Sequence, residues 1–109
     1  MAKVIGKLVR DKIVEIIEAA GGKPRWRRLT GDQTLLALNH KLQEEHRELL
    51  MAKKGGRKAQ TEELADLLEV VRALAHERGI PWKNVEAARE RKQDLRGGFS
   101  KRIFLERVE

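Results

Sequence analysis

Two pairs of acidic residues, each pair separated by three positions, are the side chains of this 109-residue sequence best suited to chemistry. Glu45 and Glu48 form the first pair, and Glu63 and Asp66 form the second. Residues three apart on a helix share a face, so each pair would project its carboxylates to one side. The pattern therefore places four carboxylates on two helical faces.

Glu45 also interrupts a leucine stripe. Leu42 and Leu49 lie one heptad apart, and Leu35 and Leu38 extend the same apolar face backwards. The repeat calls for an apolar residue at position 45. At 100° per residue, Glu45 lies at the edge of the stripe, so its carboxylate would border a helix–helix seam rather than open solvent.

A short linker between the two acidic segments predicts an antiparallel helical hairpin. If the turn centres on Gly55-Gly56, Glu48 lies level with Glu63, and Glu45 lies level with Asp66. The two levels would be about 4.5 Å apart along the helix axes. Four carboxylates this close repel one another unless a cation lies among them.

Two interpretations of these acids stay open at this point: a solvated acidic surface neutralised by lysines and arginines, and a metal site. Oxygen ligands suit Mg²⁺ or Mn²⁺ rather than zinc, and two ions about 3.5–4 Å apart would fit. Glu44 points about 100° away from Glu45, so it is either a base behind the ligands or a surface residue.

The elements that must position these residues are helical. Apolar residues recur every three or four positions, and glycine or proline ends the segments. Thr61 is a candidate N-cap after a linker at 53–60. We expect an all-α helical bundle in a single domain, 1–109, with a second chain contributing to the core. The predicted helices span residues 9–22, 34–52, 61–79 and 82–96.

Composition restricts the function further. The net charge of +7 predicts anionic partners, either nucleic acid or phosphate-bearing small molecules. The sequence contains no cysteine, so thiolate chemistry is excluded. We expect a cytoplasmic protein without a membrane partner, because the sequence has neither a membrane-length apolar run nor the apolar core of a signal peptide. Nucleic acid is not an expected partner either, because no reading-helix motif or stacking platform is present.

Three motifs in order resemble a known group of enzymes. "KLQEEHREL" followed by "EELADLLEVV" resembles the EExxE…ExxD signature of the all-α nucleoside triphosphate pyrophosphatases, the MazG-like superfamily, which includes phosphoribosyl-ATP pyrophosphohydrolases. "GKLVRDKI" and "RGGFSKRIFL" resemble flanking motifs of a small house-cleaning branch, although Val14 stands where that branch has proline. The resemblance covers nearly the whole chain.

The resemblance implies an MazG-like bundle completed by oligomerisation, as a homodimer or homotetramer. It implies hydrolysis of a nucleotide between its α and β phosphates, giving a nucleoside monophosphate and pyrophosphate. Magnesium, or manganese in its place, would be held by the matching carboxylates and would activate a water. The implied ligands are Glu45, Glu48, Glu63 and Asp66, with Glu44 as the catalytic candidate behind them.

Basic residues in and beside the flanking motifs are candidates for holding substrate phosphates, the alternative being plain surface charge. We expect a house-cleaning pyrophosphohydrolase of non-canonical nucleotides. One alternative is a phosphoribosyl-ATP pyrophosphohydrolase of histidine biosynthesis, and another is a basic, non-catalytic helical protein that binds nucleic acid. The phosphate-binding candidates are Lys7, Arg10, Lys92, Arg96, Lys101 and Arg102.

Overall fold

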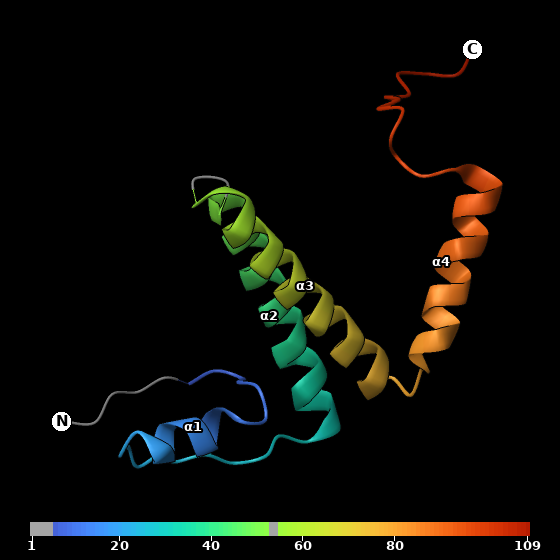
Figure 1. The fold of residues 1–109 in the computed structure, drawn as a ribbon. Helices are drawn as coiled ribbons and strands as arrows, with labels where there is room; N and C mark the ends of the chain where they lie inside the picture. Colours follow the sequence, from blue (N-terminus) through green and yellow to red (C-terminus); the bar gives the residue numbers. More distant parts are fainter. Residues whose placement is uncertain (1–5, 53–54) are drawn as a thin grey trace.

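The computed structural model describes residues 6–52 and 55–109, and every regular element in these ranges is a helix. Figure 1 shows the order of the helices along the chain. The predicted all-α fold is confirmed. The helices are α1 (Ile13–Ala19), α2 (Gly31–Ala52), α3 (Gly56–Glu77) and α4 (Trp82–Arg96).

Helices α2 and α3 form the predicted antiparallel hairpin and supply most of the helix packing in the described chain. The core between them is small. Leu38 of α2 and Val70 and Ala75 of α3 are the buried apolar side chains of the described residues. Glu45 of α2 is also buried, so a carboxylate borders this seam as the interrupted leucine stripe predicts.

The hairpin turn is tighter than the sequence predicts. Helix α3 begins at Gly56, so the predicted linker at 53–60 is wrong over residues 56–60. Thr61 is not an N-cap, because its hydroxyl donates a 2.8 Å hydrogen bond to the carbonyl of Arg57 inside the helix. Most residues between Gly56 and Thr61 are good helix formers, which explains the earlier start. Lys53 and Lys54 lie outside the described residues.

Helix α2 also begins earlier than predicted, at Gly31 instead of residue 34. Thr30 and Gln33 bond reciprocally: the Gln33 amide donates to the Thr30 hydroxyl at 3.3 Å, and the Thr30 amide donates to the Gln33 side chain at 3.2 Å. This arrangement is a capping box, which stabilises the first turn of a helix. Helix α1 is shorter than the predicted 9–22, because residues 9–10 have no regular secondary structure and residues 11–12 form a turn before it.

Helix α4 departs from the hairpin and gives the molecule an open shape (Figure 1). The described chain measures 63 × 36 × 24 Å with a radius of gyration of 18.3 Å. A compact domain of this length would have a radius of gyration of about 13 Å. Residues 97–109 follow α4 without a helix or strand. No helix in the described residues has the length and apolar character to cross a membrane.

Candidate metal centre

The acidic residues of the hairpin converge across the seam between α2 and α3. Glu45, Glu48 and Glu63 each present a carboxylate oxygen, and these oxygens all lie within 4.8 Å of one another. Glu45 is only 8% exposed, Glu63 is half-buried and Glu48 is exposed. We call these three residues the acidic cluster, which opens towards solvent at Glu48.

The predicted alignment of the two helices, which sets Glu45 opposite Asp66 and Glu48 opposite Glu63, is wrong by about one helical turn. Glu45 lies seven residues before the end of α2 at Ala52, and Glu63 lies seven residues after the start of α3 at Gly56. Glu45 is therefore level with Glu63 rather than with Asp66. Glu48 lies one turn closer to the hairpin end, where it still interacts with Glu63.

Two carboxylate oxygens of the acidic cluster have no partner in the described structure. The Oε2 atoms of Glu45 and Glu63 are buried and accept no hydrogen bond. A buried acceptor without a partner lowers the stability of the folded chain, so a proton or a cation bound to these atoms would stabilise it.

The shared environment raises the pKa values of both buried acids. Burial, hydrogen bonding to Glu63 and repulsion from Glu48, Asp66 and Glu63 raise the pKa of Glu45 to about 7. Burial and the charges of Glu48 and Asp66 also raise the pKa of Glu63. Without a cation, the cluster therefore retains protons at a pH where isolated glutamates would have lost them.

Asp66 lies beside the acidic cluster but is held differently. Its Oδ1 accepts a 2.7 Å hydrogen bond from the Arg10 guanidinium, which comes from the segment before α1. Asp66 is near enough to Glu45 and Glu63 to raise their pKa values. The structure therefore brings Asp66 and one predicted phosphate-binding residue, Arg10, to the edge of the site.

The remaining predicted residues are not gathered at the acidic cluster in the described chain. Glu44 lies near Lys41, with 3.5 Å between the charged atoms. Lys7 is exposed in the segment before α1. The other four basic candidates are exposed on α4 and the segment after it, which Figure 1 shows apart from the hairpin: Lys92, Arg96, Lys101 and Arg102.

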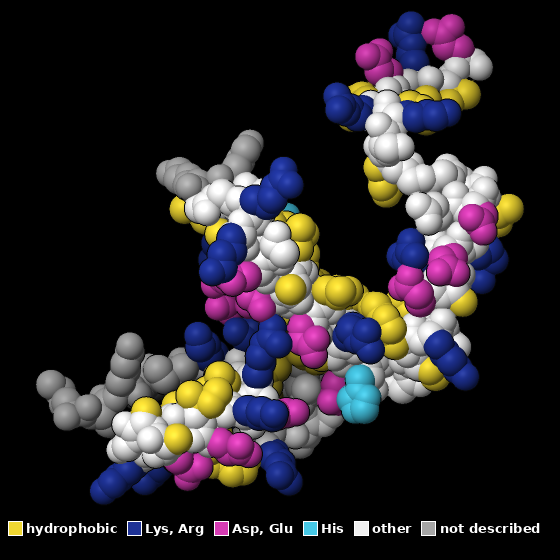
Figure 2. All heavy atoms as spheres, in the orientation of Figure 1, with side chains coloured by type: hydrophobic (Ala, Val, Ile, Leu, Met, Phe, Trp, Pro, Cys, Tyr) yellow, Lys and Arg dark blue, Asp and Glu magenta, His cyan; other side chains and the backbone are white. Residues whose placement is uncertain are grey.

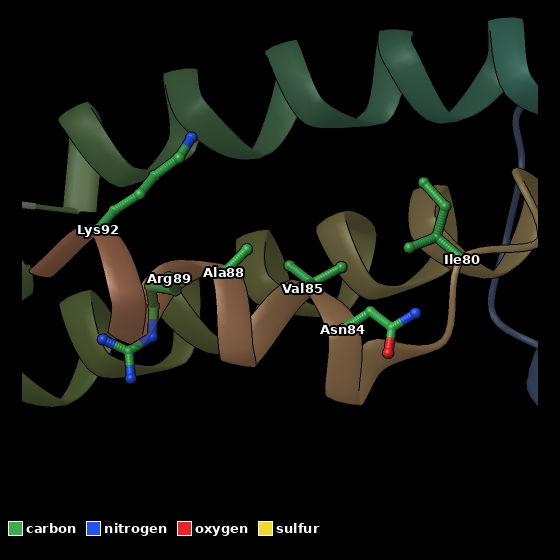
Figure 3. A pocket seen from close by; sticks show the side chains of 6 residues that line it. All are labelled: Ile80, Asn84, Val85, Ala88, Arg89 and Lys92. Carbon is green, nitrogen blue, oxygen red and sulfur yellow. The ribbon is translucent and has the colours of Figure 1, made fainter.

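A hollow of about 510 Å³ lies away from the acids, along α4 (Figure 3). It is lined by the loop residue Ile80 and by α4 side chains that include Val85 and Ala88. Trp82 at the start of α4 packs under Arg72, whose guanidinium carbon lies 4.8 Å from the ring centroid. Trp82 therefore packs against α3 of its own chain.

The donor set of the acidic cluster fits a hard divalent cation. All of its candidate ligands are carboxylate oxygens, which Mg²⁺ and Mn²⁺ prefer, and the two unpartnered oxygens lie at its buried end. A cation there would satisfy both oxygens and relieve the repulsion between the acids.

Comparison with known proteins gives one match. The family model described as phosphoribosyl-ATP pyrophosphohydrolase matches residues 23–93, a range that includes all four predicted ligands. No curated protein and no solved structure matches the chain. The matched range leaves out the two flanking motifs, so residues before 23 and after 93 stand outside this comparison.

Proposed function

The chain belongs to the phosphoribosyl-ATP pyrophosphohydrolase family of the MazG-like superfamily, and from this premise we propose that it hydrolyses nucleoside triphosphates to nucleoside monophosphates and pyrophosphate. The chain is thus a nucleotide pyrophosphohydrolase, a hydrolase of phosphoric anhydrides. The observation that carries the specific proposal is the acidic cluster with its two unpartnered buried oxygens.

In this proposal Glu45, Glu48 and Glu63 hold Mg²⁺ or Mn²⁺, and Asp66 joins them when it is released from Arg10. The bound cation would supply Lewis-acid activation of the attacked phosphate and of water. The carboxylates orient the substrate by fixing where the charge of the triphosphate is neutralised.

Two further residues have defined tasks. Arg10 carries a guanidinium at the edge of the acidic cluster, and a guanidinium can bind two phosphate oxygens at once. It would exchange Asp66 for a phosphate of the substrate. Glu44 lies on the neighbouring face of α2 near Lys41, so it would act as a general base on the attacking water through one intervening water.

The choice of substrate depends on different parts of the chain. The flanking motifs that resemble the house-cleaning branch favour non-canonical nucleoside triphosphates. Phosphoribosyl-ATP is the second candidate substrate, because the family model that matches residues 23–93 carries that description. Both substrates require the same bond cleavage and the same metal.

Pyrophosphate release from a panel of nucleotides, including phosphoribosyl-ATP, tests the proposal in the presence of Mg²⁺. Glu48→Gln should lower the rate by about 100-fold or more, as expected when a group that stabilises transition-state charge is lost. Glu62→Gln is the matched control, because Glu62 is an exposed acid beside Glu63 and is not part of the acidic cluster. Equal activity in the two variants would contradict the assigned metal site.

The same panel separates the remaining alternatives. A nucleic-acid-binding protein would release no pyrophosphate and would bind DNA or RNA with an affinity that falls steeply with salt. Glu44→Gln should lower kcat while leaving the affinity for Mn²⁺ unchanged. A loss of Mn²⁺ affinity in that variant would make Glu44 a ligand instead of a base.

A further inference from the structure

The segment between α1 and α2 carries a dense positive charge. We call residues 23–30 the basic segment, because four of the six residues from 23 to 28 are lysine or arginine. No acidic residue lies between Glu18 and Asp32. Figure 2 shows Lys and Arg side chains gathered around α1 and the chain beside it (lower left). The basic segment has no helix or strand, and its basic side chains are all exposed: Lys23, Arg25, Arg27 and Arg28.

These charges are not neutralised within the described chain. None of the four basic side chains forms an ion pair there. The basic segment joins α2 at Gly31, and Glu45 lies 14 residues, or about 21 Å, further along the helix axis. The acidic cluster is therefore about four helical turns from this junction. The charges of the basic segment are available to an anionic partner instead.

An exposed tryptophan lies in the middle of these charges. Trp26 is 57% exposed, and the guanidinium carbon of Arg28 lies 5.9 Å from the centroid of its ring. Tryptophan is highly buried in most folded chains, as the half-buried Trp82 illustrates. The ring of Trp26 is therefore a surface on which a flat group can stack, with an arginine beside it that adds cation–π attraction. The expectation that nucleic acid is not a partner rests on the lack of a stacking platform, which this exposed ring supplies.

A second hollow, of about 300 Å³, lies beside the basic segment at the start of α2. It is lined by Arg27, Leu29, Gln33, Leu36, Ala37 and His40. The apolar side chains can cover the face of a base, and the polar ones can bond its edge. Gln33 contributes an amide nitrogen, which its capping bond from the Thr30 amide does not use. Because Arg27 follows Trp26 directly, the ring and the hollow are neighbours, as the places for successive bases would be.

A single strand of nucleic acid fits these features better than a duplex or a membrane. Proteins that bind single strands combine basic side chains along the backbone with an aromatic ring for a base. A duplex presents its base edges to a helix or a β-ribbon in the major groove, and the basic segment forms neither. A peripheral membrane site uses an amphipathic helix with a broad apolar face, which is also missing from this segment. Three of the four cations are arginines, whose planar groups bind two phosphate oxygens at once.

We propose that the basic segment, with the adjoining first turns of α2, binds single-stranded nucleic acid. One base stacks on Trp26, a neighbouring base enters the hollow, and Arg28 stays beside the ring. The phosphates are bound by Lys23, Arg25 and Arg27. This site uses neither the acidic cluster nor a divalent cation, so it acts in addition to the hydrolysis of nucleotides.

Fluorescence anisotropy of labelled ten-nucleotide strands tests the proposal. The probes are uridine and thymidine decamers with 5′-hydroxyl ends, and EDTA keeps the acidic cluster free of metal. We expect the natural chain to bind these decamers, with log K falling by about 0.7 per phosphate contact for each tenfold rise in salt. Trp26→Ala should weaken binding about 10-fold or more, whereas Trp26→Phe, which keeps a ring, should weaken it about 3-fold or less. No binding of either decamer by the natural chain would overturn the proposal.

A pair of double variants tests the charges. Arg25→Ala with Arg27→Ala should weaken binding about 10-fold or more and should reduce its salt dependence. The matched control is Arg57→Ala with Lys58→Ala, which removes the same charge from exposed side chains beyond the other end of α2. Helix α2 has 22 residues, so it separates the two sites by about 33 Å. Equal weakening by both double variants would show attraction to net charge alone and would overturn the site.

Other ligands are tested by competition with the bound decamer. A ten-base-pair duplex that binds as tightly as the single strand would show that stacking on Trp26 is not used. Thymidine monophosphate that displaces the decamer at equal concentration would make this a site for a free nucleotide. Phosphatidylserine vesicles bound in place of the decamers would make it a membrane site. Each of these three results would overturn the proposal, and none depends on the proposed hydrolysis, because no triphosphate or divalent cation is present.

Discussion

Glu45 combines burial with a charge, and this makes the stability of the metal-free protein depend on pH. The folded state holds a proton on Glu45 up to about pH 7, whereas an unfolded glutamate releases it near 4.5. Between these values the folded state binds more protons, so the free energy of unfolding should fall as pH rises and should level off above pH 7.

Urea unfolding from pH 4.5 to 8 in EDTA measures this effect, with Glu45→Gln as the reference. The natural chain should lose stability relative to the variant as pH rises, because the amide has no proton to release. Parallel pH profiles for the two proteins would contradict the raised pKa of Glu45.

Divalent cations should reverse this instability at the same residue. A cation that binds only the folded state stabilises it by about 2.7 kcal/mol when its concentration is 100-fold above Kd. At pH 8 the natural chain should therefore gain several degrees in Tm with Mn²⁺, and Glu45→Gln should gain much less. Thermal unfolding followed by circular dichroism measures both shifts, and Glu62→Gln should respond as the natural chain does. Equal stabilisation of Glu45→Gln would remove this residue from the metal site.

At the scale of elements, the sequence predicts the two long helices and the convergence of their acids, but it predicts the wrong level for them. Glycines at positions 55 and 56 suggest a turn centre, whereas Gly56 is in fact the first residue of α3. Because α3 starts earlier than predicted, each of its residues lies opposite a different residue of α2, and Glu63 interacts with Glu45. The capping box of Thr30 and Gln33 is a sequence signal that could have placed the start of α2 correctly.

The segment before α1 meets the hairpin through the ion pair of Arg10 with Asp66, which no local pattern predicts because the residues are 56 positions apart. An exposed ion pair contributes about 1 kcal/mol or less to stability, so Arg10→Ala should change Tm little. If Arg10 binds phosphate in the reaction, kcat/KM should fall by roughly 10- to 100-fold, the effect of losing a charged hydrogen bond.

Steady-state kinetics and thermal unfolding of Arg10→Ala and Arg10→Lys test this role together. Lysine keeps the charge but cannot bind two phosphate oxygens with one planar group, so it should restore activity only in part. A variant that loses Tm and activity in proportion would show that Arg10 acts on stability alone.

For the whole molecule, the sequence predicts an apolar surface larger than one chain can bury, but it does not predict the open shape. The helices α3 and α4 and the break at Gly79 and Pro81 are all readable from the sequence. The angle at this elbow is not, because it depends on the bonds of Ile80 and Gly79 and on the stacking of Arg72 over Trp82. That angle decides whether α4 covers its own hairpin or leaves it open.

So little apolar surface is buried within one chain that folding should be coupled to association. The stability of a protein that folds only on association depends on its concentration. For a dimer, a 100-fold increase in protein concentration should stabilise the folded state by about 2.7 kcal/mol. Tm of the natural chain should therefore rise with protein concentration.

Leu68→Asp tests the same coupling at one position. This variant should have a lower Tm and should sediment as a monomer, because Leu68 is an exposed apolar residue of α3 and a charge there disfavours burial against a second chain. Ile16→Asp, on α1, should behave as the natural chain does. A Tm that is independent of concentration, with Leu68→Asp unchanged, would show that one chain is stable without a partner.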